Sequence, residues 1–298
     1  MLTRRKILIT GASGMLGRVL SRRFSSENEV VGVSKTGRDK TVACDISADK
    51  EITVLFQTTK PDLVLNAAAY SDVDGCERDP ELAYACNALA VKYLAALCGA
   101  CGVPMVHVST DYVFDGRKNT PYVETDSTDP VNIYGVSKLG GEFYAAQEKS
   151  PTVIVRTSWL FGPENPANFV NAILGRLKKD AVVSVLDDQT DAPTYVGDLC
   201  LAIEKIAARL CSTKEKPLKS KIYHVCNAGS TTRYDMTLEI KKILRLDKVQ
   251  VVKARRESIQ GRLAMRPPYA VMSSRYFEES FGMKLRPWQE SLREYLLN

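Results

Sequence analysis

The chain has 298 residues, of which 45% are hydrophobic and 26% are charged, and its formal net charge is +6. This composition predicts a large hydrophobic core, organised as one big domain or as a domain with a smaller appendage. We find no apolar run of the roughly 20 residues that a membrane-spanning helix needs, and no secretory signal pattern follows Met1. We therefore expect a cytoplasmic protein without a membrane partner.

The distribution of basic residues and cysteines argues against two further classes of protein. The one dense basic cluster, Lys214 to Lys221, contains Pro217 and lacks aromatic residues, so we interpret it as a solvated surface loop and expect no nucleic-acid partner. The eight cysteines show no disulfide-like regularity, and Cys98 and Cys101 have no second pair to complete a zinc site. We expect reduced thiols and no metal.

The first half of the chain alternates short β-branched segments with helical segments, which is typical of βαβ units and a parallel sheet. The predicted strands are Lys6–Thr10, Val30–Val33, Leu63–Asn66, Met105–Ser109 and Thr152–Arg156. The predicted helices between them are Leu16–Phe24, Pro80–Cys101 and Ile133–Gln147. The expected fold class is α/β, a Rossmann-like doubly wound parallel sheet whose ligands bind beyond the carboxyl ends of the strands.

The second half of the chain is less regular, because prolines after Trp159 divide it into short segments. Helices are predicted at Asp235–Leu244 and Trp288–Leu297. We assign residues 1–157 to a dinucleotide-binding domain that takes later strands from 181–226. Residues 158–298 are assigned mainly to a smaller, partly discontinuous substrate-binding lobe.

A glycine-rich loop, G-A-S-G-M-L-G, follows the first predicted strand and opens the first predicted helix. Its glycines permit a tight turn and let backbone amides approach a pyrophosphate at the positive end of the helix. The loop residues expected to bind a dinucleotide cofactor are Gly11, Ser13, Gly14, Met15, Leu16 and Gly17.

The residues after the second strand indicate which cofactor binds. NAD-selective sites place an acid here for the adenosine ribose hydroxyls, whereas a 2′-phosphate favours cations and hydroxyls. Ser34, Lys35 and Arg38 occupy this stretch, so we expect NADPH, with NADH as the alternative. Close backbone contact with the cofactor is expected from the small residues and their neighbours after the strand Leu63–Asn66, namely Ala67, Ala68, Ala69, Tyr70 and Ser71.

Tyr134 and Lys138 are four residues apart on a predicted helix, so their side chains project to the same side. A neighbouring ammonium favours the phenolate, and we expect Lys138 to lower the pKa of Tyr134 toward working pH, where the phenol can exchange a proton with a substrate oxygen. Lys138 can also hold the nicotinamide ribose.

Upstream, Ser109 and Thr110 end a strand beside the expected nicotinamide position, where a hydroxyl can orient a substrate carbonyl.

Longer motifs resemble one family over almost the whole chain. They are T-D-Y-V-F-D-G at 110–116, Y-G-V-S-K-L-G-G-E at 134–142, R-T-S-W-L-F-G at 156–162 and N-F-V at 168–170, followed by D-D-Q, P-T, D-L and R-P at 187–189, 193–194, 198–199 and 266–267. Together with the G-x-x-G-x-x-G loop, they are similar to the dTDP-4-dehydrorhamnose reductase family, in the extended branch of the short-chain dehydrogenase/reductase superfamily.

The resemblance implies a reductase that uses NADPH to reduce the C4 keto group of dTDP-4-dehydro-L-rhamnose, giving dTDP-L-rhamnose for cell-surface polysaccharide. It implies that Tyr134 donates the proton, that Lys138 is its electrostatic partner and that Thr110 orients the keto oxygen. The superfamily pattern also brings Asp45 and Ile46 to the adenine. The residues expected against the nucleotide sugar are Thr110, Asp111, Trp159, Asn168 and Arg266.

The sequence departs from the family pattern mainly in its second half. Thr190-Asp191-Ala192 stands where the family often has a glycine between its D-Q and P-T elements, Thr232-Arg233 replaces a common Ser-Trp pair, and Ala270 replaces a usual serine. These departures leave the exact sugar and nucleotide open. Some members are dimers bridged by a metal through an acid on the first helix. This chain has Arg18-Val19 there, so no metal is carried over, while a homodimer is compatible with the sequence.

Relatives that share the fold differ in chemistry. A 4,6-dehydratase has T-D-E where this chain has Thr110-Asp111-Tyr112, and an epimerising fucose synthase adds a cysteine and a histidine that have no counterpart here. A 4-epimerase retains NAD, which the missing acid after Val33 disfavours. Two alternatives stay open: a reductase of a different nucleotide 4-keto-6-deoxysugar, and a non-catalytic NADP-binding regulatory subunit similar to the β-subunit of methionine adenosyltransferase.

Overall fold

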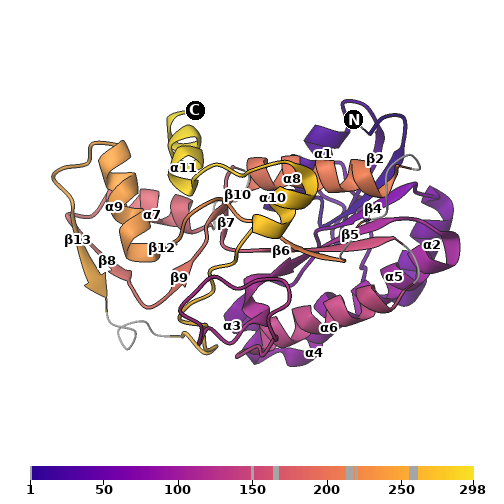
Figure 1. The fold of residues 1–298 in the computed structure, drawn as a ribbon, viewed down its shortest axis with the longest axis horizontal. Coiled ribbons are helices and arrows are strands. Elements are labelled where there is room, and N and C mark those ends of the chain that lie inside the picture. Colours follow the sequence, from indigo (N-terminus) through magenta and orange to yellow (C-terminus); the bar gives the residue numbers. More distant parts are fainter. Residues whose placement is uncertain (1, 149–150, 164–167, 213–217, 219–220, 255–260) are drawn as a thin grey trace.

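The computed structural model describes residues 2–148, 151–163, 168–212, 218, 221–254 and 261–298. Most of the basic cluster at 214–221 therefore lies outside the described residues. Figure 1 shows a large sheet covered by helices on both faces, with a smaller lobe beside it that carries β8 and β13.

The predicted parallel sheet is confirmed. Within the described residues it has seven strands in the order β11-β6-β5-β4-β1-β2-β3, and every pairing is parallel. The strands are β1 (Lys6–Thr10), β2 (Glu29–Ser34), β3 (Val42–Ala43), β4 (Leu63–Asn66), β5 (Met105–Thr110), β6 (Thr152–Thr157) and β11 (Ile222–His224). Strand order reverses between β1 and β4, so the crevice for a ligand lies beyond these strand ends.

Helices pack on both faces of the sheet because alternate strand side chains point to opposite faces. On one face, Ile7 and Ile9 of β1 share a core with α1 (Met15–Phe24) and α8 (Val196–Leu210). On the other face, Leu8 shares a core with α2 (Asp49–Thr59) and α5 (Ala90–Cys101), and α6 (Ile133–Gln147) lies beside α5. The result is a three-layer domain (Figure 1).

The segment Pro80–Cys101 is helical throughout, with α4 (Pro80–Tyr84) passing through a π-helical turn, η1 (Ala85–Leu89), into α5. Among the described helices it alone is long and apolar enough to span a membrane by length and hydropathy, which corrects the expectation that no segment approaches this limit. Its residues Val91, Leu94 and Cys98 are buried in the core under the sheet. Packing against the sheet accounts for its apolar composition.

The smaller lobe has its own core, formed by α7 (Phe169–Leu177), α9 (Arg233–Ile243), α11 (Trp288–Leu297) and the parallel pair β8 (Val182–Leu186) and β13 (Gln250–Ala254). Two further short pairs lie between lobe and sheet: β7 (Leu160–Phe161) with β10 (Thr194–Tyr195), and β9 (Thr190–Asp191) with β12 (Thr231–Thr232). Of the described strands within 181–226, only β11 joins the central sheet. Two helices of the second half, α8 and α10 (Arg275–Phe281), pack in the core of the larger domain.

Candidate active site

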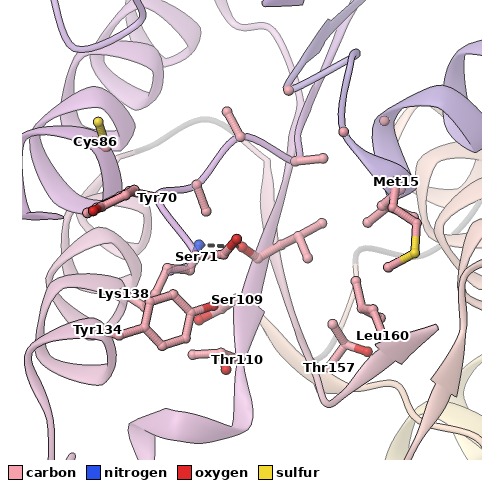
Figure 2. A pocket seen from close by; sticks show the side chains of 18 of the residues that line it. Met15, Tyr70, Ser71, Cys86, Ser109, Thr110, Tyr134, Lys138, Thr157 and Leu160 are labelled. Carbon is pink, nitrogen blue, oxygen red and sulfur yellow. Dashed lines mark hydrogen bonds between the residues drawn. The ribbon is translucent and has the colours of Figure 1, made fainter. Parts of the chain in front are cut away.

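A cleft of about 840 Å³ lies beyond the carboxyl ends of the central strands, bounded on its other side by residues of the smaller lobe. Figure 2 shows Ser109, Thr110 and Tyr134 close together on one side of the cleft, with Met15 and Leu160 on the other. Of the residues predicted for cofactor or substrate, all except Arg38 and Arg266 line this cleft. The cleft therefore collects side chains that are far apart in sequence, as expected at a strand-order reversal.

The glycine loop between β1 and α1 has a geometry that needs glycine. Gly11 has a φ of 67°, and a Cβ there would lie 2.7 Å from the amide nitrogen of Ala68. A Cβ on Gly17 would collide with the carbonyl oxygen of Gly11. The helix begins after Gly14 with no side-chain cap and no acid in its first turn. This cradle of backbone amides at a positive helix end fits a pyrophosphate, and so fits a dinucleotide cofactor.

The end of β2 carries the residues expected to select NADPH. The hydroxyl of Ser34 accepts a hydrogen bond from the Gly37 amide, and the Lys35 ammonium lies 2.7 Å from the Asp45 carboxylate. The hydrogen bond to Asp45 raises the pKa of Lys35. Burial alone would raise the pKa of Asp45, but its hydrogen bonds, including the one from Lys35, outweigh burial and lower this pKa. Arg38 is exposed and lies outside the cleft lining, so its predicted cofactor contact has no support from this geometry.

Tyr134 and Lys138 lie on the first turns of α6. Asn132 caps this helix through its side-chain oxygen, which accepts a hydrogen bond from the Gly135 amide at 2.8 Å. The Lys138 side chain is only 2% exposed, and its Nζ donates a 2.7 Å hydrogen bond to the carbonyl oxygen of Val108 on β5. The helix spacing and this tether together place the phenol and the ammonium in the same cleft, as predicted.

The pKa values of the two groups differ from the expectation. Burial raises the pKa of the Tyr134 phenol, an effect that the Thr110 hydroxyl only partly offsets, so the predicted lowering of this pKa is wrong for the protein by itself. Burial lowers the pKa of Lys138 to about 8, partly opposed by the carboxylate of Glu142. The physical reason is desolvation, which penalises the charged form of each group. At neutral pH the site therefore holds a protonated phenol beside an ammonium.

The hydroxyls at the end of β5 are both engaged. Thr110 donates to the Asp111 carboxylate at 2.9 Å and accepts from the Tyr112 amide at 3.2 Å. Ser109 donates to Glu142 at 2.5 Å, and Glu142 in turn forms a buried ion pair with Arg156 at 2.7 Å. The Thr110 side chain lies next to Tyr134 in the cleft (Figure 2). Ser109 is instead held by the buried ion pair of Glu142 with Arg156.

The smaller lobe supplies the expected substrate side of the cleft. Trp159 has a positive φ of 41°, an uncommon conformation for a bulky residue, and its ring packs edge-on against Phe169 with the Arg233 guanidinium 5.1 Å from the ring centre. Asn168 caps α7 by accepting from the Asn171 amide at 3.0 Å. Arg266 is instead held by two 2.6 Å hydrogen bonds to Asp74.

Two buried carboxylates, Asp111 and Asp191, line the cleft. The family motif predicts Asp111 at the substrate, whereas the sequence marks Asp191 only as a departure from the family pattern. Burial raises the pKa of Asp111, helped by the charge of Asp191. Burial also raises the pKa of Asp191, although the cation of Arg233 opposes it. Within the described part of the chain, no group of three or more His, Cys, Asp or Glu side chains is arranged to hold a metal ion.

Comparison with curated proteins identifies close relatives over nearly the full length. The chain is 35% identical to the spore coat polysaccharide biosynthesis protein SpsK of Bacillus subtilis, covering 98% of this chain and 96% of that protein. It is 34% identical to a dTDP-4-dehydrorhamnose reductase of Mycolicibacterium smegmatis, covering 97% of this chain and 84% of that protein.

A solved structure and a family model agree with these relatives. The structure of a dTDP-4-dehydrorhamnose reductase from Bacillus anthracis in complex with NADP matches with a TM-score of 0.89, at 30% identity and 99% coverage of both chains. The family model described as RmlD substrate binding domain matches residues 5–298. The resemblance seen in the motifs is thereby confirmed, and the chain belongs to the RmlD substrate binding domain family.

Proposed function

We propose that this protein reduces the C4 keto group of dTDP-4-dehydro-L-rhamnose with NADPH to give dTDP-L-rhamnose, in the cytoplasm and for cell-surface polysaccharide. The observation that carries the proposal is the convergence of Tyr134, Lys138 and Thr110 in one cleft with the glycine loop. The similarity to dTDP-4-dehydrorhamnose reductases over nearly the full chain supports the substrate class. A nucleotide sugar is the proposed partner, and neither nucleic acid nor membrane is proposed.

The cofactor site is assigned by its donors. The amides of the glycine loop and the first turn of α1 bind the pyrophosphate. Ser34 and Lys35 bind the 2′-phosphate, for which Lys35 exchanges part of its contact with Asp45. Lys138, held at Val108, is placed to hydrogen-bond the nicotinamide ribose. When bound, NADPH supplies the hydride that reaches C4 of the sugar.

Tyr134 supplies the proton. Its raised pKa keeps the phenol protonated at neutral pH, which is the form that a reduction needs. The oxygen at C4 becomes an alkoxide-like base as the hydride arrives, and an alkoxide is a much stronger base than a phenolate, so the proton moves from Tyr134 to that oxygen. The Lys138 ammonium stabilises the phenolate left behind. Thr110 turns its hydroxyl from Asp111 to the keto oxygen and orients it.

The test is an NADPH-oxidation assay with a panel of nucleotide 4-keto-6-deoxysugars, repeated with NADH. We expect dTDP-4-dehydro-L-rhamnose to give the highest kcat/KM, with dTDP-L-rhamnose as the product and NADPH preferred. A higher kcat/KM with another ketone would reassign the substrate. No oxidation with any of them, together with copurification of a methionine adenosyltransferase, would instead establish the regulatory alternative.

A further inference from the structure

Asp191 carries a buried carboxylate oxygen that accepts no hydrogen bond from the residues that the structure describes. The side chain is 2% exposed and lines the cleft. Among the residues that the structure describes, its Oδ1 atom has no hydrogen-bond partner. A buried acceptor without a partner is unfavourable, and one that lines a binding cleft is suited to a donor on the ligand.

The backbone around Asp191 is held firmly, so the position of this carboxylate is set by the fold. Strand β9 pairs with β12 on one side, with Asp191 opposite Thr231. On the other side the Thr190 amide donates to the Pro268 carbonyl, and the Ala270 amide donates to the Thr190 carbonyl, both at 2.9 Å. Backbone hydrogen bonds on both sides of β9 therefore fix the position of Asp191 in the cleft.

The two cations whose charge acts on Asp191 make their hydrogen bonds elsewhere. Arg233 donates to the side-chain oxygen of Gln189 at 2.8 Å. Arg262 donates to the same oxygen at 3.1 Å and to the Asp188 carboxylate at 2.7 Å. These guanidinium groups lower the charge cost of burying Asp191, but within the described residues neither donates a hydrogen bond to its buried Oδ1.

The position of Asp191 within the cleft points to the sugar ring. Two residues before Asp191, the Gln189 amide donates a 3.3 Å hydrogen bond to the Tyr112 hydroxyl, and the Tyr112 ring lies edge-on to Tyr134 at 5.7 Å. Asp191 lines the same cleft as Tyr134, the proposed proton donor. Arg233, whose charge acts on Asp191, packs over the Trp159 ring of the smaller lobe.

We propose that Asp191 accepts a hydrogen bond from a ring hydroxyl of the sugar and thereby selects ketone substrates that carry this hydroxyl over their deoxy counterparts. This inference rests on the proposed function for the identity of the ligand class. A site with a buried acceptor rejects a ligand that lacks the donor, because the acceptor is then left unpaired.

Calorimetry in the presence of NADP+ tests the inference without turnover. The ligands are dTDP-L-rhamnose and dTDP alone, and the proteins are wild type, Asp191→Ala and Asp191→Asn. We expect Asp191→Ala to weaken the binding of dTDP-L-rhamnose by about 10- to 100-fold and to leave the affinity for dTDP unchanged. Asn retains a neutral acceptor oxygen, so the affinity of Asp191→Asn for dTDP-L-rhamnose should lie between those of wild type and Asp191→Ala. The matched control is Asp187→Asn, which removes a nearby carboxylate that pairs with the exposed Lys253 and is not in the lining.

Substrate analogues then identify the hydroxyl. Wild type should lose about 10- to 100-fold in kcat/KM on the 2-deoxy or the 3-deoxy ketone, and Asp191→Ala should abolish that difference, mainly through KM. Equal weakening of dTDP and dTDP-L-rhamnose in Asp191→Ala, or no change in either, overturns the inference. If wild type reduces no ketone but binding of the sugar still depends on Asp191, the proposed function fails and the inference stands. If wild type reduces the ketones and Asp191→Ala changes neither binding nor turnover, the proposed function stands and the inference fails.

Discussion

The Nζ atom of Lys138 lies 2.7 Å from the carbonyl oxygen of Val108. Lys138, the proposed electrostatic partner of Tyr134, is therefore hydrogen-bonded to strand β5. This contact fixes α6 against the end of the strand that carries Thr110. It also explains how an ammonium can be retained at a site that is almost fully buried, because the backbone carbonyl replaces part of its lost hydration.

The first prediction concerns pH. Because burial lowers the pKa of Lys138 to about 8, its ammonium is lost as pH rises through that value. The phenolate that forms on Tyr134 then loses its stabilising charge, and we expect kcat for ketone reduction to decline above about pH 8. A Lys138→Arg variant, whose guanidinium stays charged, should be slower at neutral pH but should lack this decline. If kcat of the Lys138→Arg variant declines at high pH as in wild type, another group causes the decline.

The second prediction concerns the buried ion pair between Glu142 and Arg156, whose side chains are each 4% exposed. Glu142→Gln leaves the Arg156 charge buried without its counter-ion, and we expect the free energy of unfolding to fall by roughly 3–5 kcal/mol. Denaturant titration measures it. The control is Glu279→Gln, which breaks the exposed pair with Arg275 and should change the free energy of unfolding far less, because water screens both charges. Equal effects of the two substitutions would contradict the importance of burial.

The third prediction concerns the glycine loop. An alanine Cβ at Gly17 would collide with the Gly11 carbonyl oxygen, so the loop must shift. We expect Gly17→Ala to weaken NADPH binding by at least about tenfold, as measured by fluorescence titration. Gly175 lies on α7 with open space around its Cβ position, and Gly175→Ala should leave NADPH affinity intact while stabilising the helix by about 0.5–1 kcal/mol. Wild-type affinity in Gly17→Ala would show that the loop does not hold the cofactor.

The fourth prediction concerns cofactor preference. If Lys35 contacts the 2′-phosphate, Lys35→Ala should raise KM for NADPH by about three- to tenfold, a modest effect because the side chain is largely exposed, and should leave KM for NADH unchanged. Arg38→Ala removes a second cation that lies outside the cleft lining and should affect neither cofactor. A larger effect of Arg38→Ala than of Lys35→Ala would show that Arg38 is the main cation at the 2′-phosphate.

Much of the fold and site could be predicted because the relevant signals are local. The strands and helices of the first half follow from hydrophobic period and glycine placement, and the convergence of strand ends follows from the topology of a parallel sheet. The pairing of Tyr134 with Lys138 needs only the helical repeat. These features require no knowledge of contacts between distant residues.

The remaining features depend on tertiary contacts that no local pattern encodes. Arg266 is predicted at the substrate from the motif alone, and no local pattern indicates its pair with Asp74, which lies 192 positions away in the sequence. The pKa of Tyr134 was expected to fall, but it rises because the depth of burial outweighs its neighbours. Asp191 could be seen only as a departure from a pattern, since its unpaired oxygen is apparent only when the surrounding side chains are placed.

The fifth prediction tests the central claim that Tyr134 is the proton donor. The measurement is kcat of Tyr134→Phe for NADPH oxidation with dTDP-4-dehydro-L-rhamnose, with NADPH affinity determined on the same protein. We predict that kcat falls by about 100-fold or more while NADPH binds as in wild type, because only the phenolic hydroxyl is removed. Activity within a few-fold of wild type would contradict the account.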